Sequence, residues 1–295
     1  MDVNGRKLTF PMRIVLSGGT GFLGRPLAAA LTAAGHRTVV LPRAQTGWGN
    51  EIDGAGAVVN LAGEPIAARR WSDGHKARIL DSRLQVTRTI VNAIRDAASP
   101  PAVFISGSAV GYYGPLRDEI VTEDAPPGSD FLASVCAQWE AEAMRAAGRA
   151  RVVCVRTGLA LERDGGALPQ MLPPFKFGVG GPVGSGRQYW PWIHRDDWIA
   201  LVRWAIDTPS VTGPVNATAP SPITNAEFAR ALGRALHRPA FMPAPAFALR
   251  LLLGEMADAL LLSGQRAVPA KAQRLGFTFR YSQLDDALRA IFPLG

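Results

Sequence analysis

The chain has 295 residues, of which 47% are apolar and 19% are charged. This composition can bury a sizeable core and excludes an intrinsically disordered protein. The 32 Lys and Arg residues outnumber the 24 Asp and Glu residues, but no run of five cations occurs, so we expect no nucleic-acid partner.

The N-terminal residues and the two cysteines favour a reducing compartment. Residues 1–11 contain no apolar signal-peptide core, and we expect a disordered extension there. Cys136 and Cys154 lack metal-ligand spacing and cannot build a disulfide framework, so we expect no metal and a cytoplasmic location. Residues 239–264 are the most apolar stretch, but prolines and charges interrupt them. They predict a buried or interfacial helix, and we expect no membrane partner.

The first half of the chain alternates apolar strands with helices. A β-branched strand at residues 13–17 leads into a glycine-rich turn at 18–24 and a helix at 22–34, and further apolar strands follow at 38–41 and 57–61. Strands that are apolar on both faces are typical of a parallel sheet covered by helices on both sides.

The alternation continues with a helix at 75–98, a strand at 102–106, a helix at 131–147 and a strand at 151–156. Repeated β-α-β units imply right-handed crossovers and a doubly wound parallel sheet. The sequence therefore predicts an α/β fold of the Rossmann type, with a dinucleotide-binding domain at residues 12–160.

Beyond residue 158 the pattern changes. A loop-rich stretch contains Pro173-Pro174 and the glycines of residues 178–186, and helices are predicted at 196–207 and 225–237. We expect residues 161–295 to form a smaller, mainly helical substrate lobe over the carboxyl ends of the strands, with segments that return to the sheet.

The turn after the first strand matches Gly-x-x-Gly-x-x-Gly at Gly18, Gly21 and Gly24. Gly18 permits the tight turn and Gly21 lets the backbone approach a pyrophosphate. Gly24 allows close helix packing, with the phosphates at the helix N-terminus. The position between a strand and a helix makes this a strong signal for dinucleotide binding. The predicted contacts are Gly18, Thr20, Gly21, Phe22, Leu23 and Gly24.

The end of the second strand indicates which dinucleotide is bound. Proteins that bind NAD usually offer Asp or Glu there, and residues 38–47 contain neither. Arg43 is the only charged side chain in that stretch and suits the 2′-phosphate of NADP, because a guanidinium pairs with phosphate in a bidentate manner. The sequence therefore favours NADP(H) over NAD, with Arg25 as a second cation. The alternative for Arg43 is a solvated loop cation.

With these motifs the chain resembles an extended-type short-chain dehydrogenase/reductase of the NAD-dependent epimerase/dehydratase superfamily. It is most similar to an atypical epimerase-like subfamily of unknown activity that carries its own C-terminal domain. The matching stretches cover nearly the whole chain from Met12, and they are residues 18–24, 60–64, 70–71, 82–83, 108–114, 192–196 and 276–280.

The resemblance implies further cofactor contacts. Leu61, Ala62 and Gly63 would pack their backbone on the cofactor ribose, and Arg83 would approach the nucleotide from the opposite wall. An intrahelical pair with a carboxylate is the alternative for Arg83. Ser106 ends a strand at the edge where ligands bind in such sheets.

The catalytic residues depart from the family pattern. Extended dehydrogenases carry a Tyr-x-x-x-Lys pair, but none of the four lysines has a tyrosine four residues before it. Tyr113 is the best remaining candidate for a proton donor and Ser108 the second catalytic candidate, because their loop reaches the sheet edge. Glu64 and His194 are weaker candidates. A packing or capping role is the alternative for Tyr113, Glu64 and His194.

The resemblance implies an NADP(H)-dependent reductase or epimerase-like enzyme for an unknown small-molecule substrate. Because the Tyr/Lys pair is missing, a catalytically silent sensor or scaffold that binds NADP(H) is the alternative. A cell-division inhibitor, a third function associated with such relatives, has no support in these residues. The resemblance also implies a homodimer through the helices at residues 75–98 and 131–147.

Overall fold

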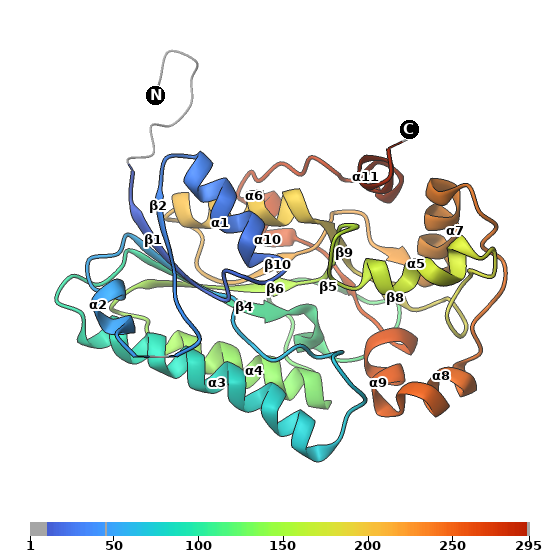
Figure 1. The fold of residues 1–295 in the computed structure, drawn as a ribbon, viewed down its shortest axis with the longest axis horizontal. Helices are drawn as coiled ribbons and strands as arrows, with labels where there is room; N and C mark the ends of the chain where they lie inside the picture. Colours follow the sequence, from blue (N-terminus) through green and yellow to red (C-terminus); the bar gives the residue numbers. More distant parts are fainter. Residues whose placement is uncertain (1–10, 45, 294–295) are drawn as a thin grey trace, which may run out of the picture.

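The computed structural model describes residues 11–44 and 46–293. The expected N-terminal extension falls almost wholly on residues 1–10, which lie outside the described residues. The centre of the fold is a parallel six-stranded sheet (Figure 1). Its strands, in spatial order, are β10 (Gly213–Ala217), β6 (Arg151–Thr157), β4 (Val103–Ala109), β3 (Ala57–Asn60), β1 (Arg13–Ser17) and β2 (Arg37–Val40).

The strand order determines where a ligand is expected. The chain leaves β1 for β2 on one side and then crosses over to β3 on the other side of β1. In open α/β sheets, ligands bind beyond the carboxyl ends of the strands at such a reversal. The predicted doubly wound parallel sheet is confirmed, and its reversal lies between β1 and β3.

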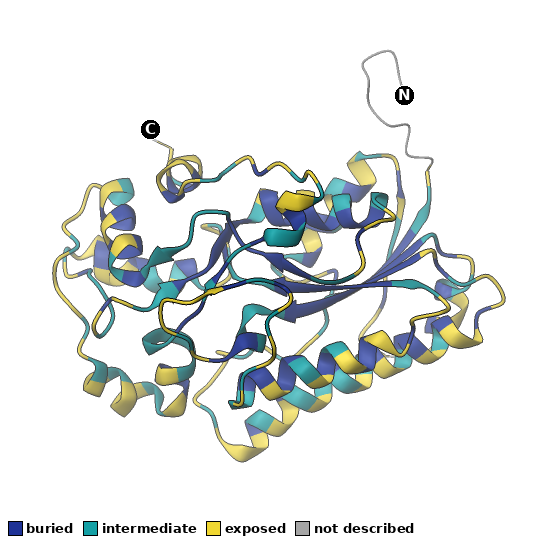
Figure 2. Ribbon diagram, turned by 180° about the vertical axis from the view of Figure 1, so that it is seen from behind, coloured by how far each residue is buried: buried dark blue, intermediate teal, exposed yellow. Residues whose placement is uncertain are grey.

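Helices cover both faces of the sheet (Figure 1). One face packs against α1 (Gly24–Ala33) and α6 (Arg195–Asp207), and the other against α2 (Trp48–Ile52), α3 (Asp73–Asp96) and α4 (Phe131–Met144). Figure 2 shows buried strands between helices that are exposed on their outer sides. The unbroken apolar runs of the strands follow from this double cover.

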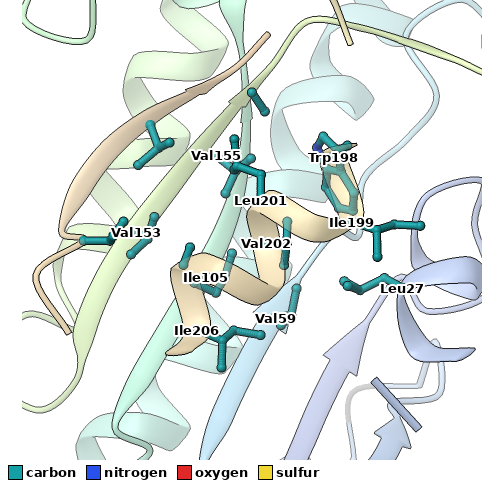
Figure 3. Packing of buried hydrophobic residues seen from close by; sticks show 14 of the residues in the cluster. Leu27, Val59, Ile105, Val153, Val155, Trp198, Ile199, Leu201, Val202 and Ile206 are labelled. Atoms are coloured by element: carbon teal, nitrogen blue, oxygen red, sulfur yellow. The ribbon is translucent and has the colours of Figure 1, made fainter. Parts of the chain in front are cut away.

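Consecutive side chains of a strand point to opposite faces of the sheet. In β1, Ile14 and Leu16 join the cluster under α1 and α6, whereas Val15 joins the cluster over α3. Full burial of each such side chain contributes about 1.5–3 kcal/mol. Figure 3 shows the first cluster, with the labelled residues Leu27, Val59, Ile105, Val153, Val155, Trp198, Ile199, Leu201, Val202 and Ile206.

The remaining elements are short. The strands are β5 (Ile120–Val121), β7 (Leu159–Leu161), β8 (Tyr189–Trp190), β9 (Trp192–His194), β11 (Ile223–Thr224) and β12 (Arg266–Ala267). The helices are α5 (Leu168–Lys176), α7 (Asn225–Leu236), α8 (Ala246–Leu253), α9 (Glu255–Ala257), α10 (Ala270–Arg274) and α11 (Leu284–Ile291). Two irregular turns are η1 (Val110–Tyr113) and η2 (Asp258–Leu262). A third apolar cluster joins α5, α7 and α11.

Two sequence-based predictions for the second half need correction. The stretch around Pro173-Pro174 contains the helix α5, which forms because Leu168, Leu172 and Phe175 are buried on one side while both prolines face solvent. The apolar stretch at 239–264 contains α8, and none of the residues of α8 is buried, so the expectation of a buried helix is wrong there. Within the described residues, no helix is long and apolar enough to cross a membrane.

Candidate functional site

The glycine-rich turn lies at the carboxyl end of β1. Gly18 has a φ of 71°, a conformation that favours glycine. A Cβ on Gly24 would overlap the Gly18 carbonyl oxygen and lie 2.8 Å from the Gly19 Cα. The Gly21 amide donates to the Gly18 carbonyl oxygen at 3.1 Å. All three motif glycines therefore take part in one compact turn.

The start of α1 suits an anion. No side chain caps this end of the helix, and its first turn contains no acidic residue. The exposed Thr20 and Gly21 line a hollow of about 530 Å³ together with Phe22, Arg25, Asp164 and Arg195. The positive end of the helix and the nearby Arg25 favour a phosphate group here. The predicted contact residue Leu23 precedes the first residue of α1.

The loop after β3 packs against this turn, across the reversal of strand order. A Cβ on Gly18 would lie 2.7 Å from the Ala62 amide nitrogen and 2.7 Å from the Leu61 carbonyl carbon. Gly63 is exposed beside them. The structure thus brings Gly18 and residues 61–63 together at one edge of the sheet. Glycines without side chains at such an edge let a dinucleotide approach the backbone closely.

Buried hydrogen bonds hold the two loops in register. The Asn60 Oδ1 accepts from the Ser17 hydroxyl at 2.6 Å and from the Ala62 amide at 3.2 Å, and its Nδ2 donates to the Thr87 Oγ1 at 2.9 Å. The Trp139 Nε1 donates to the same oxygen at 2.9 Å. Sequence reasoning missed these residues as site residues, although Asn60 lies in a stretch that matches the subfamily.

Arg43 follows β2 and is exposed. It makes no hydrogen bond or ion pair with the residues that the structure describes. A guanidinium without a protein carboxylate can pair with phosphate at no cost to the fold. The residues at this edge therefore fit a dinucleotide with an extra phosphate.

Arg83 lies behind Gly63 on α3. It donates to the carbonyl oxygens of Ile79 at 2.9 Å and Glu64 at 3.1 Å, and its guanidinium carbon lies 5.1 Å from the centre of the Trp139 ring. Burial lowers the pKa of Arg83, partly opposed by nearby Cys136 and Glu64. The hydrogen bonds go to carbonyl groups, so Arg83 holds the loop at 61–64 against α3.

The end of β4 carries Ser106 and Ser108. The buried Ser106 hydroxyl donates to the Gly107 carbonyl oxygen at 3.2 Å. The Ser108 hydroxyl donates to the Glu140 Oε1 at 2.6 Å. Glu140 comes from α4 and pairs with Arg156 of β6, with Nε–Oε1 and Nη2–Oε2 distances of 2.8 Å each. Ser108 thus belongs to a buried charged network.

Tyr113 occupies the centre of that network and is 2% exposed. Its hydroxyl donates to the Asn216 Oδ1 at 2.6 Å and accepts from the Arg156 Nη1 at 3.0 Å. Burial raises the pKa of Tyr113 to about 12, against the opposing effect of Arg156. The adjacent Tyr112 is half-buried, and the Arg156 guanidinium carbon lies 3.5 Å from the centre of its ring. The structure therefore places one cation against two phenols.

The helix α4 carries Cys136 beside Ser108. Burial raises the pKa of Cys136 to about 11, so its thiol is protonated at neutral pH. The cation that contacts the Tyr113 hydroxyl is Arg156, which comes from β6. Sequence reasoning missed Glu140, Arg156 and Asn216, because they lie on three separate elements and form no local motif.

Of the two weaker catalytic candidates, Glu64 and His194, the structure gives a capping role to His194. The Glu64 amide donates to the Ser82 hydroxyl at 2.9 Å. The buried His194 Nδ1 accepts from the Asp196 amide at 3.0 Å and caps α6. Among the described residues, no group of three His, Cys, Asp or Glu side chains could hold a metal.

His194 predicts a pH dependence of stability. Burial lowers its pKa, against the opposing effects of Asp196 and Glu162. The unfolded imidazole takes up a proton near pH 6.5 and the folded one only at lower pH, so stability present above about pH 6.5 is lost as the pH falls. We expect His194→Asn, which keeps a capping oxygen, to reduce this loss. Urea unfolding at pH 7.5 and 5.5 checks it, and equal losses in both proteins would contradict it.

Comparison with known proteins agrees with this geometry. The model of the NAD dependent epimerase/dehydratase family matches residues 14–217, and a domain of unknown function (DUF1731) matches residues 244–291. The epimerase family protein SDR39U1 homolog, chloroplastic, of Arabidopsis thaliana is 42% identical over 95% of this chain and 86% of its own length.

Two solved structures are also similar. The human epimerase family protein SDR39U1 (isoform 2), crystallised with NADPH, has a TM-score of 0.91 and 37% identity over 95% of this chain and 99% of its own. The nucleoside-diphosphate sugar epimerase of Corynebacterium glutamicum has a TM-score of 0.78 and 32% identity over 96% of this chain and 58% of its own. The chain belongs to the NAD dependent epimerase/dehydratase family.

Proposed function

We propose that this protein binds NADP(H) at the edge between β1 and β3 and acts as a reductase or epimerase-like enzyme on a small molecule. The observation that carries the proposal is the contact between the Gly18 turn and residues 61–62, together with Arg43, which has no hydrogen-bond or ion-pair partner among the described residues. The NADPH in the human relative supports the choice of cofactor.

In this proposal, different residues of the chain bind different parts of the cofactor. The turn from Gly18 to Gly24 holds the pyrophosphate, Arg43 binds the 2′-phosphate, and residues 61–63 pack on the ribose. Arg83 supports that wall, and Ser106 at the end of β4 would contribute to the cofactor site. When bound, the nicotinamide supplies or accepts a hydride.

Tyr113 and Ser108 are the proposed catalytic residues. The Tyr113 hydroxyl is protonated at neutral pH, and it can donate to a substrate oxygen once it releases Asn216. Arg156 then stabilises the negative charge on the phenol oxygen from 3.0 Å. Ser108 orients the substrate while Glu140 accepts its proton in a hydrogen bond.

A catalytically silent NADP(H) sensor or scaffold is the second candidate function. The burial of Tyr113 at 2% exposure favours it, because a substrate cannot reach the hydroxyl without a rearrangement. Hydride transfer to any carbonyl substrate would exclude this function. The buried free thiols of Cys136 and Cys154 support a cytoplasmic location as part of either proposal, and a homodimer through α3 and α4 remains an expectation from the family.

Titration of the purified protein with NADPH and NADH, followed by nicotinamide fluorescence, tests the cofactor site. We expect tighter binding of NADPH, and we expect Arg43→Glu to weaken NADPH binding by roughly 10- to 100-fold, since a hydrogen bond to a charged group contributes about 1.5–3 kcal/mol. The variant should leave NADH binding almost unchanged.

The control is Arg37→Glu, which changes an exposed arginine at the opposite end of β2. It introduces the same charge change and should bind NADPH like the unaltered protein. Equal affinities for the two cofactors, or an Arg43→Glu variant that binds like the Arg37→Glu control, would refute the assignment of Arg43. Failure of both cofactors to bind would refute the site.

A further inference from the structure

Large apolar side chains are exposed on one end of the substrate lobe. Seven side chains of this kind, all at least 47% exposed, lie within residues 177–179 and 241–252. They are Phe177, Val179, Phe241, Met242, Phe247, Leu251 and Leu252. We call these seven residues the apolar end face. In Figure 1 the segments that carry them lie around α5, α7 and α8 at one end of the molecule.

The two segments of the apolar end face run side by side. The Met242 amide donates to the Gly180 carbonyl oxygen at 3.1 Å, and the Ala244 amide donates to the Pro182 carbonyl oxygen at 2.8 Å. The Gly184 amide donates back to the Ala244 carbonyl oxygen at 2.9 Å. This backbone pairing places the segment with Phe177 and Val179 next to the segment with Phe241 and Met242. The second segment continues into α8.

The helix α8 presents an apolar side to solvent. Phe247, Ala248, Leu251 and Leu252 are exposed and recur at helical spacing. Arg250, also exposed, pairs with Asp258 at 2.8 Å. Scattered apolar residues on a surface need no explanation, but a contiguous apolar helix face with adjoining aromatic loop residues indicates a binding surface.

The charged side chains of this face that form no ion pair with the described residues are cations, because Asp258 and Asp285 are paired with Arg250 and Arg234. Residues 165–195 and 228–254, which build it, contain no Asp or Glu. Arg230, Arg234, His237 and Arg238 line a hollow of about 630 Å³ that also contains Phe241. Arg234 is paired with Asp285, whereas Lys176, Arg230 and Arg238 form no ion pair within the described part of the chain. The face is thus apolar with a cationic border.

We propose that the apolar end face binds the surface of an anionic phospholipid bilayer. The side chains of α8 and the flanking phenylalanines enter the acyl boundary, and the arginines of the hollow contact lipid phosphates. A second copy of the chain fits less well, because the unpaired cations of the two copies would face each other. This proposal does not depend on the cofactor, and it differs from the sequence-based expectation of no membrane partner because α8 exposes its apolar side chains.

Co-sedimentation with vesicles tests the proposal. We expect the protein to bind vesicles made of equal parts phosphatidylcholine and phosphatidylglycerol. We expect it to bind only weakly to vesicles made of pure phosphatidylcholine. The double variant Phe247→Ser/Leu251→Ser and the double variant Arg230→Gln/Arg238→Gln should each lower the partition coefficient by about tenfold or more. Circular dichroism and thermal unfolding check that both variants are folded.

Ile120→Ser is the matched control, since Ile120 is an exposed apolar residue of β5 outside the face. It should bind the mixed vesicles like the unaltered protein. Equal binding to both kinds of vesicle, or no binding to either, would overturn the proposal. A dimer in light scattering that Phe247→Ser/Leu251→Ser dissociates, without vesicle binding, would assign the face to a second copy instead.

Discussion

Gly24→Ala is expected to abolish measurable NADPH binding and to destabilise the fold. The added Cβ would overlap the Gly18 carbonyl oxygen and lie 2.8 Å from the Gly19 Cα. The turn cannot move away, because Gly18 already contacts the backbone at residues 61–62. We expect a loss of at least about 100-fold in affinity and about 1–3 kcal/mol in the free energy of unfolding. Fluorescence titration and urea unfolding measure the two effects.

Variants of two other glycines distinguish an effect on NADPH binding from an effect on folding. A Cβ on Gly21 would lie 3.3 Å from the Gly18 carbonyl oxygen, so Gly21→Ala should fold almost normally and still bind NADPH poorly, because the methyl group occupies the pyrophosphate side. Gly49 in α2 has no atom within 4 Å of an added Cβ, and Gly49→Ala should be neutral or stabilising. Normal NADPH binding by Gly24→Ala would show that the turn is not the cofactor site.

The sequence predicted the parts of the fold that local signals determine. The strand, glycine turn and helix at residues 13–33 form a contiguous unit, so apolar runs and glycine spacing were sufficient to locate it. Helix ends were less accurate, and α4 ends at Met144 rather than at residue 147. The reversal of strand order between β1 and β3 depends on pairing across the sheet, which no local pattern encodes.

The charged network shows why part of the site could not be predicted. Arg156 pairs with Glu140, 16 residues away, and the Tyr113 hydroxyl binds Asn216, 103 residues away. No spacing rule connects such positions, and only the order of β4, β6 and β10 in the sheet brings them together.

The exposure of α8 could not be predicted for a similar reason. Its sequence is almost wholly apolar, and apolar residues usually lie in a core. Periodicity describes which residues share a side of a helix but not whether another element covers that side. The buried cluster of the lobe consists instead of α5, α7 and α11.

Arg156→Met is expected to destabilise the protein by about 3–5 kcal/mol, because it leaves a buried carboxylate without its partner. The side chains of Arg156 and Glu140 are only 3% and 12% exposed, and two hydrogen bonds of 2.8 Å join them. The variant also removes a donor from the Tyr113 hydroxyl. Urea unfolding at neutral pH measures the change in the free energy of unfolding.

The double variant Arg156→Met/Glu140→Gln distinguishes a lost charge pair from lost packing. If the unpaired carboxylate causes most of the damage, the neutral glutamine should restore part of the stability that the single variant loses. Arg289→Met breaks an exposed pair with Asp286 and should cost less than about 1 kcal/mol. An Arg156→Met effect no larger than that of Arg289→Met would mean that the network adapts to the loss of its cation, and the proposed electrostatic role of Arg156 beside Tyr113 would then fail as well.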